Sequence, residues 1–207
     1  MTPATITPTP AGTHPKTPGI GPQPYRWTIQ EYRQLGQAGL FRDMKTMLID
    51  GEILTMPQPA PPHNTALNLM QEFLRVAFAT GHHVRNQMAL DVGTRNDPGP
   101  DLAVVEGSIR DYATRQATTA VLVVEIADSS LFLDSTTKAE LYATAGVPEY
   151  WVLDLEHRQL LVFRDPVPLP SGLGATAYRI HLTFGPNETV SPLAAPAAVV
   201  KVADLLP

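Results

Sequence analysis

The stretch Pro100-Asp101-Leu102-Ala103-Val104-Val105 is followed in the chain by Val121-Leu122-Val123-Val124-Glu125-Ile126-Ala127 and then by Lys138. Both apolar runs are short, rich in valine and bounded by polar or turn residues, which is typical of buried β-strands. Asp101 begins the first run, and Glu125 comes near the end of the second. The pattern predicts two central strands that each carry one carboxylate at the rim of a buried sheet.

These carboxylates predict a specific chemistry. A carboxylate at the rim of a sheet is costly to desolvate unless it pairs or binds a cation. On adjacent strands, Asp101 and Glu125 would offer the hard oxygen ligands that Mg²⁺ or Mn²⁺ prefers. Lys138 falls on the helix that we expect over Leu133–Ala145, from which its ammonium could reach the same place. Around one metal ion, such residues position a water, offset developing charge and cleave phosphodiesters.

The same residues also have a purely structural interpretation. Asp101 would cap a turn, Glu125 would pair with a nearby arginine or lysine, and Lys138 would be solvated. Asp134 lies four residues before Lys138, an orientation that favours a surface ion pair worth about 0.3–0.5 kcal/mol. Spacing alone leaves both interpretations open.

Composition bounds the class of protein. A chain of 207 residues is long enough for one domain with a sizeable core. The absence of cysteine excludes disulfides, thiolate catalysis and cysteine-bound zinc. We find no apolar run of membrane-spanning length and no signal-peptide pattern, so we expect a cytoplasmic protein without a membrane segment.

The net charge of −5 bears on nucleic-acid binding. Proteins that grip nucleic acid mainly through its phosphates usually carry a basic excess. Here the densest basic cluster is small: His82, His83 and Arg85. This balance argues against tight non-specific binding to DNA, although a local basic patch beside a metal could suffice.

The remaining patterns predict the order of the elements. Residues 1–24 are dominated by Pro, Thr, Gly and Ala, so we expect a disordered tail before a single domain over residues 25–207. Asp50-Gly51 is a strong hairpin signal, and Thr28 with Glu31 forms a capping box. Further elements follow from periodicity: helices over Thr28–Gln37 and His63–Ala79; a hairpin of Thr46–Ile49 and Glu52–Met56; strands over His83–Val92, Pro148–Asp154, Gln159–Phe163 and Ala177–Leu182; and a loop over Asp165–Ala175.

Together these residues resemble the Uma2 family, which is assigned to the PD-(D/E)XK, or restriction endonuclease-like, superfamily. The resemblance covers Tyr25 to Phe163. It is carried by the following segments: Leu48–Ile53, His63, Pro100–Val105, Val124–Leu131, Asp134, Lys138, Tyr142-Ala143 and Gly146–Asp154.

The resemblance implies an α/β fold with a restriction endonuclease-like core, in which helices flank a mixed, mostly antiparallel central β-sheet. It also implies that Asp101 and Glu125 bind Mg²⁺ or Mn²⁺, with the backbone carbonyl of Ile126 or Ala127 as a further ligand. The superfamily usually places its lysine two residues after the glutamate, where this chain has Ala127; Lys138 matches the position from which the family supplies it instead. Two further positions match: Glu52, an acid at the outer shell of the metal, and His63, near the mouth of the site.

The resemblance implies an endonuclease acting on DNA. A homodimer would suit a small nuclease that must cut two strands. Two positions depart from the family pattern. Met47 stands where an acid is often found, and Asp128-Ser129-Ser130 replaces the more common Ser-Pro-Ser. The acidic charge balance and Met47 favour one alternative, an inactive nucleic-acid-binding or protein-interaction module on the same fold. A metal-dependent hydrolase for a substrate other than nucleic acid is a further alternative.

Overall fold

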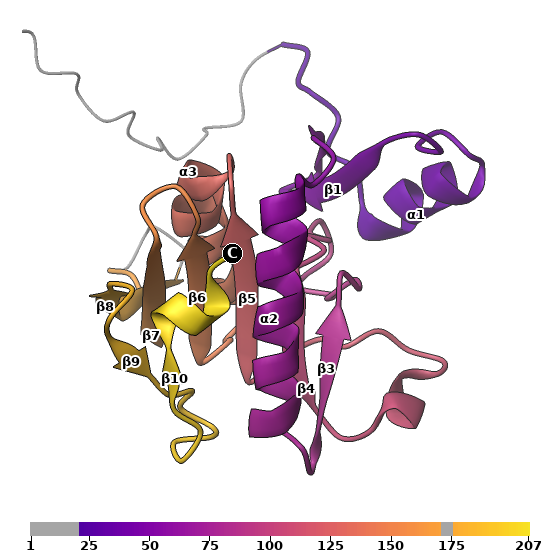
Figure 1. The fold of residues 1–207 in the computed structure, drawn as a ribbon. Helices are drawn as coiled ribbons and strands as arrows, with labels where there is room; N and C mark the ends of the chain where they lie inside the picture. Colours follow the sequence, from indigo (N-terminus) through magenta and orange to yellow (C-terminus); the bar gives the residue numbers. More distant parts are fainter. Residues whose placement is uncertain (1–20, 171–175) are drawn as a thin grey trace, which may run out of the picture.

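A six-stranded sheet forms the centre of the computed structural model, which describes residues 21–170 and 176–207 (Figure 1). Its strands lie in the order β3 (His82–Asn86), β4 (Leu102–Glu106), β5 (Leu122–Ala127), β6 (Glu149–Asp154), β7 (Gln159–Pro168) and β8 (Thr176–Phe184). Neighbouring strands are antiparallel except β5 and β6, which are parallel. The predicted mixed, mostly antiparallel sheet is confirmed. The expected tail over residues 1–24 falls largely on residues outside the described part.

Helix α2 (Pro61–Ala77) covers one face of the sheet, with Leu67, Met70 and Leu74 buried against it. Successive side chains of a strand point to opposite faces. Accordingly, Leu102 and Val104 of β4 pack on the α2 side, whereas Ala103 and Val105 pack on the other side. This alternation divides the core into two apolar layers.

The second face is covered by a helix in three parts: α3 (Leu131–Leu133), a π-helical turn η2 (Asp134–Lys138) and α4 (Ala139–Thr144). Tyr142 and Ala143 are buried on this side of the sheet, and the rings of Tyr142 and Tyr150 lie 5.0 Å apart. The chain leaves the helix at Gly146, whose φ of +74° is easily adopted by glycine. The predicted helix is confirmed in position, but the π-turn within it was not foreseen.

A small unit lies at one end of the molecule. It consists of helix α1 (Ile29–Gln37) and a hairpin of β1 (Lys45–Ile49) and β2 (Glu52–Met56). The Thr28 capping box is present, and Asp50 and Gly51 both have positive φ, as a tight hairpin turn requires. Leu48 and Asp97 join the unit to the domain through two backbone hydrogen bonds of 2.8 and 3.1 Å. Figure 1 shows the hairpin at the end of the molecule where α2 begins and β5 ends.

Three predicted boundaries were wrong. Helix α2 begins at Pro61 instead of His63, because proline is well accommodated in the first turn of a helix. Strand β3 ends at Asn86, since Gln87 adopts a positive φ of 48° and turns the chain away. Strand β7 continues to Pro168 into the predicted loop because β8 pairs with it that far.

The C-terminal segment packs back on the α2 side. It contains β9 (Thr189–Val190), β10 (Val200–Lys201) and a 3₁₀ turn, η3 (Val202–Leu205), and a further 3₁₀ turn, η1 (Ile109–Tyr112), lies between β4 and β5. In residues 21–170 and 176–207, none of the helices has the length and apolar character of a membrane span.

Candidate active site

One pocket of about 730 Å³ lies at the end of the sheet where β5 finishes. It is lined by all the predicted site residues except Glu52, namely His63, Asp101, Glu125, Ile126 and Lys138. Its inner wall is formed by the sheet and the two helices that flank it: His63, Gln87, Asp101, Glu125, Ile126 and Lys138. Its outer wall comes from the start of β1 with the residues before it and from the end of β2 with the residues after it, residues 42–47 and 56–60. Strands β4 and β5 therefore place their carboxylates in a pocket that the hairpin unit helps to enclose.

Asp101 lies directly before β4 and is buried. Its Oδ2 accepts a hydrogen bond from the Ile126 N–H at 2.9 Å and lies 3.2 Å from His63 Nε2, while its Oδ1 accepts one from Gln87 Nε2 at 3.2 Å. Burial raises the pKa of a carboxyl, but the bonds from His63, Ile126 and Gln87 outweigh it and hold the Asp101 pKa below its usual value. Asp101 is therefore ionised at neutral pH.

Glu125 has the opposite electrostatic character. Its Oε1 accepts a hydrogen bond from the Tyr142 hydroxyl at 2.9 Å and lies 3.1 Å from Lys138 Nζ, and its Oε2 lies 3.4 Å from the backbone nitrogen of Asp101. Burial raises the pKa of Glu125 to about 8, despite the ammonium beside it. Two adjacent carboxyls whose pKa values are driven apart are characteristic of active sites.

Lys138 joins Glu125 to Asp134. Its Nζ lies 2.8 Å from Asp134 Oδ1 and 3.1 Å from Glu125 Oε1. Burial lowers the pKa of an ammonium, but these two carboxylates outweigh burial and raise the Lys138 pKa above its usual value. The lysine is therefore a cation at neutral pH. This disfavours the role of proton acceptor and favours that of charge stabiliser.

The expected ion pair between Asp134 and Lys138 forms, but it is buried and does not lie at the surface. The Asp134 side chain is 1% exposed and that of Lys138 is 3% exposed. Ser130 Oγ donates to the Asp134 carboxylate, which fixes that carboxylate under the lysine. Both residues belong to the π-turn, a feature frequent at functional sites.

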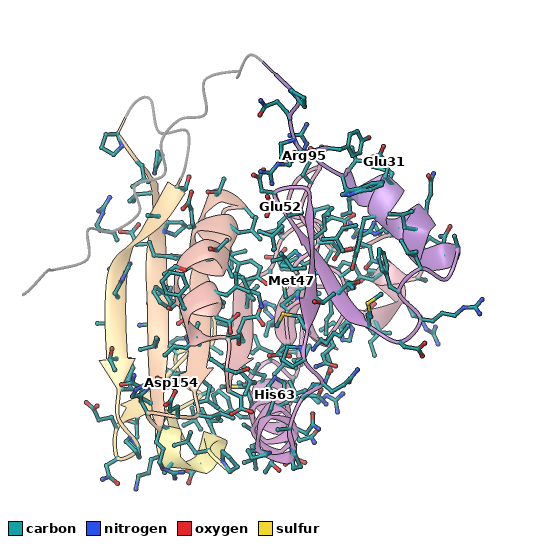
Figure 2. The ribbon with its side chains drawn as sticks, turned by 90° about the horizontal axis from the view of Figure 1, so that it is seen from above. Glu31, Met47, Glu52, His63, Arg95 and Asp154 are labelled. Carbon is teal, nitrogen blue, oxygen red and sulfur yellow. The ribbon has the colours of Figure 1, made fainter. Side chains whose placement is uncertain are left out.

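Glu52 is the predicted metal-site residue that the structure does not bring to the pocket. It follows the turn at the far end of the hairpin, where its side chain is 58% exposed and pairs with Arg26 at 2.6 Å. In Figure 2, Glu52 lies near Arg95, and Met47 lies between it and His63. Met47, which replaces the family acid, is buried and lines the pocket. The hairpin therefore faces the pocket with Met47 and not with Glu52.

His63 was expected near the mouth of the site and instead lies within it. The side chain is in the first turn of α2, is largely buried and contacts Asp101 through Nε2. Its Nδ1 is buried and has no hydrogen-bond partner among residues 21–170 and 176–207. His63 thus orients Asp101 with one nitrogen and retains a second polar atom inside the site.

The structure also discriminates between the two backbone carbonyls that the resemblance left open. The Ala127 carbonyl accepts a hydrogen bond from the Leu155 N–H at 3.0 Å, which directs it away from Asp101. The Ile126 N–H points at Asp101, and in a strand the N–H and C=O of one residue point to the same side. Ile126 is therefore the better placed of the two to ligate a metal.

Three residues with a place in this network were not recognised as functional from the sequence: Gln87, Asp134 and Tyr142. Asp134, Lys138 and Tyr142 are spaced by four residues on one helix, a signal that they share a face. Gln87 carried no such signal, because its position depends on the turn that ends β3.

The donor atoms fit a hard divalent cation that retains much of its water. Two carboxyls and one carbonyl are oxygen ligands, and Mg²⁺ is commonly held by one or two carboxylates plus waters. In the described part of the chain, no group of three or more His, Cys, Asp or Glu side chains is arranged to hold a metal. Asp101, Glu125 and the Ile126 carbonyl would therefore offer a metal few protein ligands.

Comparisons with known proteins identify the family and a solved structure of the same fold. A model of the Uma2 family, described as a putative restriction endonuclease, matches residues 29–202. A crystal structure described as a putative nuclease belonging to DUF820, from Anabaena variabilis, superposes with a TM-score of 0.68 over 86% of this chain and 97% of that chain. At 17% identity, this likeness shows the shared fold. A search of curated proteins finds no match.

Proposed function

This chain belongs to the Uma2 family, and we propose that it is a Mg²⁺- or Mn²⁺-dependent endonuclease that hydrolyses phosphodiester bonds of DNA. One observation carries the proposal: Asp101, Glu125 and a cationic Lys138 meet in a single pocket. A metal site beside a fixed cation has the components that phosphodiester hydrolysis requires.

Asp101, Glu125 and the Ile126 carbonyl would hold the ion. Bound there, the ion polarises a phosphate oxygen and lowers the pKa of a coordinated water. Asp101 is already ionised through its hydrogen bonds with His63, Ile126 and Gln87. Glu125 must lose a proton to bind a cation, and Lys138 stabilises the carboxylate that results.

Lys138 supplies a fixed positive charge at the pocket wall. The Asp134 carboxylate and the Glu125 side chain hold it in place, at 2.8 and 3.1 Å from Nζ. From this position the ammonium can donate to the attacking water or to a phosphate oxygen as negative charge develops. A preorganised donor of this kind is worth roughly 10²–10³ in rate.

A second candidate is a binding module that keeps the fold without the chemistry. Two observations favour it: the net charge of −5 and the presence of Met47 in the pocket, where the family often has an acid. The buried set of Asp101, Glu125 and Lys138 favours the enzyme, because burying charged groups is costly and a binding module gains little from doing so.

The test is cleavage of supercoiled plasmid by the purified protein with Mg²⁺ or Mn²⁺, beside an EDTA control and the Asp101→Asn variant. Nicking or linearisation that requires metal and disappears in the variant is the expected result. A folded protein that binds metal and leaves the plasmid intact would contradict the endonuclease proposal and favour the binding module.

Two further expectations stay predictions. A homodimer would let one enzyme reach both strands, and light scattering measures the mass that decides it. A cytoplasmic location is tested by fractionation of cells that produce the protein.

A further inference from the structure

The outer wall of the pocket carries two cations and several apolar side chains, whereas the inner wall carries the two carboxyls and Lys138. This difference bears on whether the substrate is single-stranded or double-stranded. We propose that the pocket accepts a single strand of DNA in preference to an intact duplex, with Arg42 and Lys45 binding phosphates next to the scissile one. The inference rests on the proposed nuclease function and specifies its substrate.

Burial of the reacting groups is the first argument. Asp101 is 5% exposed, and Glu125 and Lys138 are each 3% exposed. The pocket of about 730 Å³ lies within the range of roughly 300–1,000 Å³ typical of sites that enclose small molecules. The backbone of a duplex is held on the outside of a stiff double helix, whereas a single strand can bend one nucleotide into such a pocket.

The second argument is the position of two cations. Arg42 and Lys45 line the outer wall of the pocket that also holds Asp101 and Glu125. Within residues 21–170 and 176–207, neither side chain has an ion-pair partner in the structure. Besides these two cations and the charged residues of the inner wall, the pocket is lined by the carboxylates of Asp43 and Asp128. Two cations are enough to bind two phosphates of a short stretch of nucleic-acid backbone.

The side chain of Arg42 lies beside Gly39. A Cβ atom at Gly39 would lie 2.7 Å from Arg42 Nε. Gly39 has a positive φ of 87°, which a larger residue adopts only with strain.

The third argument is apolar surface beside these cations. Met44 is 47% exposed, and together with Met56, Pro57 and Pro59 it lines the same wall. Enzymes that take a base out of the helical stack hold it between apolar or aromatic side chains. In a duplex the bases are stacked inside and would leave this surface unused.

Binding of fluorescent oligonucleotides in EDTA tests the inference without any need for cleavage. The Asp101→Asn protein is titrated with one labelled sequence, as a single strand and as a duplex, over a range of salt concentrations. Arg42→Ala with Lys45→Ala is the test variant, and Arg95→Ala with Lys201→Ala is a matched control, because both control cations are exposed and lie outside the pocket.

We expect tighter binding of the single strand. Each lost phosphate contact lowers the slope of log K against log salt by about 0.7 for single strands, so the test variant should lose about 1.4 and the control nothing. Equal or tighter binding of the duplex, or equal slopes in the two double variants, would overturn the inference. Circular dichroism verifies that each variant is folded.

The two proposals fail in different ways. If the wild-type protein cuts relaxed duplex and the Asp101→Asn protein binds duplex as tightly as the single strand, the proposed nuclease function is supported and the proposed preference for single strands is refuted. If single strands bind through Arg42 and Lys45 but no DNA is cut with either metal, the preference stands and the nuclease falls.

Discussion

Two glutamates are buried in neighbouring parallel strands, and only one of them, Glu125, lines the pocket. Glu149 begins β6, whereas Glu125 lies near the end of β5, so the two occupy opposite ends of the sheet. Glu149 is fully buried and Glu125 is 3% exposed. Burial of a carboxylate therefore does not by itself identify a functional residue.

The difference lies in what surrounds each carboxylate. Glu149 accepts hydrogen bonds from Trp151 Nε1 at 2.9 Å, from Arg164 Nε at 2.8 Å and from the Leu193 N–H at 2.7 Å. Arg164 in turn donates to the Ser191 carbonyl at 2.7 Å, which ties the C-terminal segment to the sheet. Glu149 thus has a structural role, because it links β6 to the C-terminal segment directly and through Arg164.

Glu125 opens instead onto a pocket and shares its lysine with Asp134. Its donors, Tyr142 and Lys138, both lie on the helix that follows β5. A carboxylate whose bonds are completed inside the fold stabilises the structure, whereas one that faces a pocket remains available to a ligand. Four substitution experiments put this comparison to the test.

The largest effect on stability is expected at Glu149. Glu149→Ala leaves Arg164 without its carboxylate partner, and breaking a buried pair in this way costs about 3–5 kcal/mol. Glu125→Gln should cost much less at neutral pH, because burial already favours the uncharged carboxyl. Urea unfolding at pH 7 without metal measures both, and equal losses would contradict the distinction.

The effects on the rate of cleavage should have the reverse order, with the larger effect beside Glu125 and the smaller one beside Glu149. Lys138→Met removes the fixed cation of the pocket and should lower the rate of plasmid cleavage by roughly 10²–10³. Arg164→Met makes the same kind of change at the partner of Glu149. It should lower stability but leave the rate of cleavage unchanged at temperatures below the melting temperature of the variant. A comparable loss of rate in both variants would show that Lys138 acts only through the fold.

The pH dependence of stability should follow Glu125. Its pKa is 4.5 before burial and about 8 in the folded protein, so the folded state binds the proton more tightly. Glu125 therefore stabilises the metal-free protein at low pH, and this contribution falls by up to about 1.4 kcal/mol per pH unit between 4.5 and 8. Unfolding of the wild type and of Glu125→Gln from pH 5 to 9 measures it, and parallel curves would refute the assignment.

Tyr142→Phe should give the smallest effect. It removes one hydrogen bond to Glu125, worth about 0.5–1.5 kcal/mol. Tyr178→Phe is a matched control, since its hydroxyl bonds to the Val147 carbonyl away from the pocket. Both variants should lose similar stability, but only Tyr142→Phe should move the pH midpoint of the Glu125 contribution upwards. A midpoint that moves equally in both would contradict this.

Much of the fold was accessible from the sequence because local signals agreed with the global arrangement. The valine-rich runs around Asp101 and Glu125, the Asp50-Gly51 turn and the Thr28 capping box each specify local geometry, and the structure confirms them. The end of β7 was missed because it depends on pairing with β8, which is far away in the sequence.

The site was predictable where the residue types carry chemistry and unpredictable where tertiary contacts decide. Asp101, Glu125 and Lys138 were found from their spacing and from the family resemblance. The burial of Asp134 depends on a π-turn that periodicity does not reveal. Glu52 was misplaced because a residue beside a hairpin turn can lie far from the face that its strand presents.

The most direct test of the central claim is a thermal melt with and without millimolar Mg²⁺ or Mn²⁺. Ligands that bind only the folded state stabilise it, by about 2.7 kcal/mol at a hundred times the dissociation constant. Asp154→Asn is the matched control for Asp101→Asn, since Asp154 is equally buried but bonds to His157 and Gln159 outside the pocket. The pocket described above predicts a metal-dependent rise in melting temperature for the wild type and for Asp154→Asn, and none for Asp101→Asn. A wild-type melt that neither metal shifts, or a rise that survives in Asp101→Asn, would contradict it.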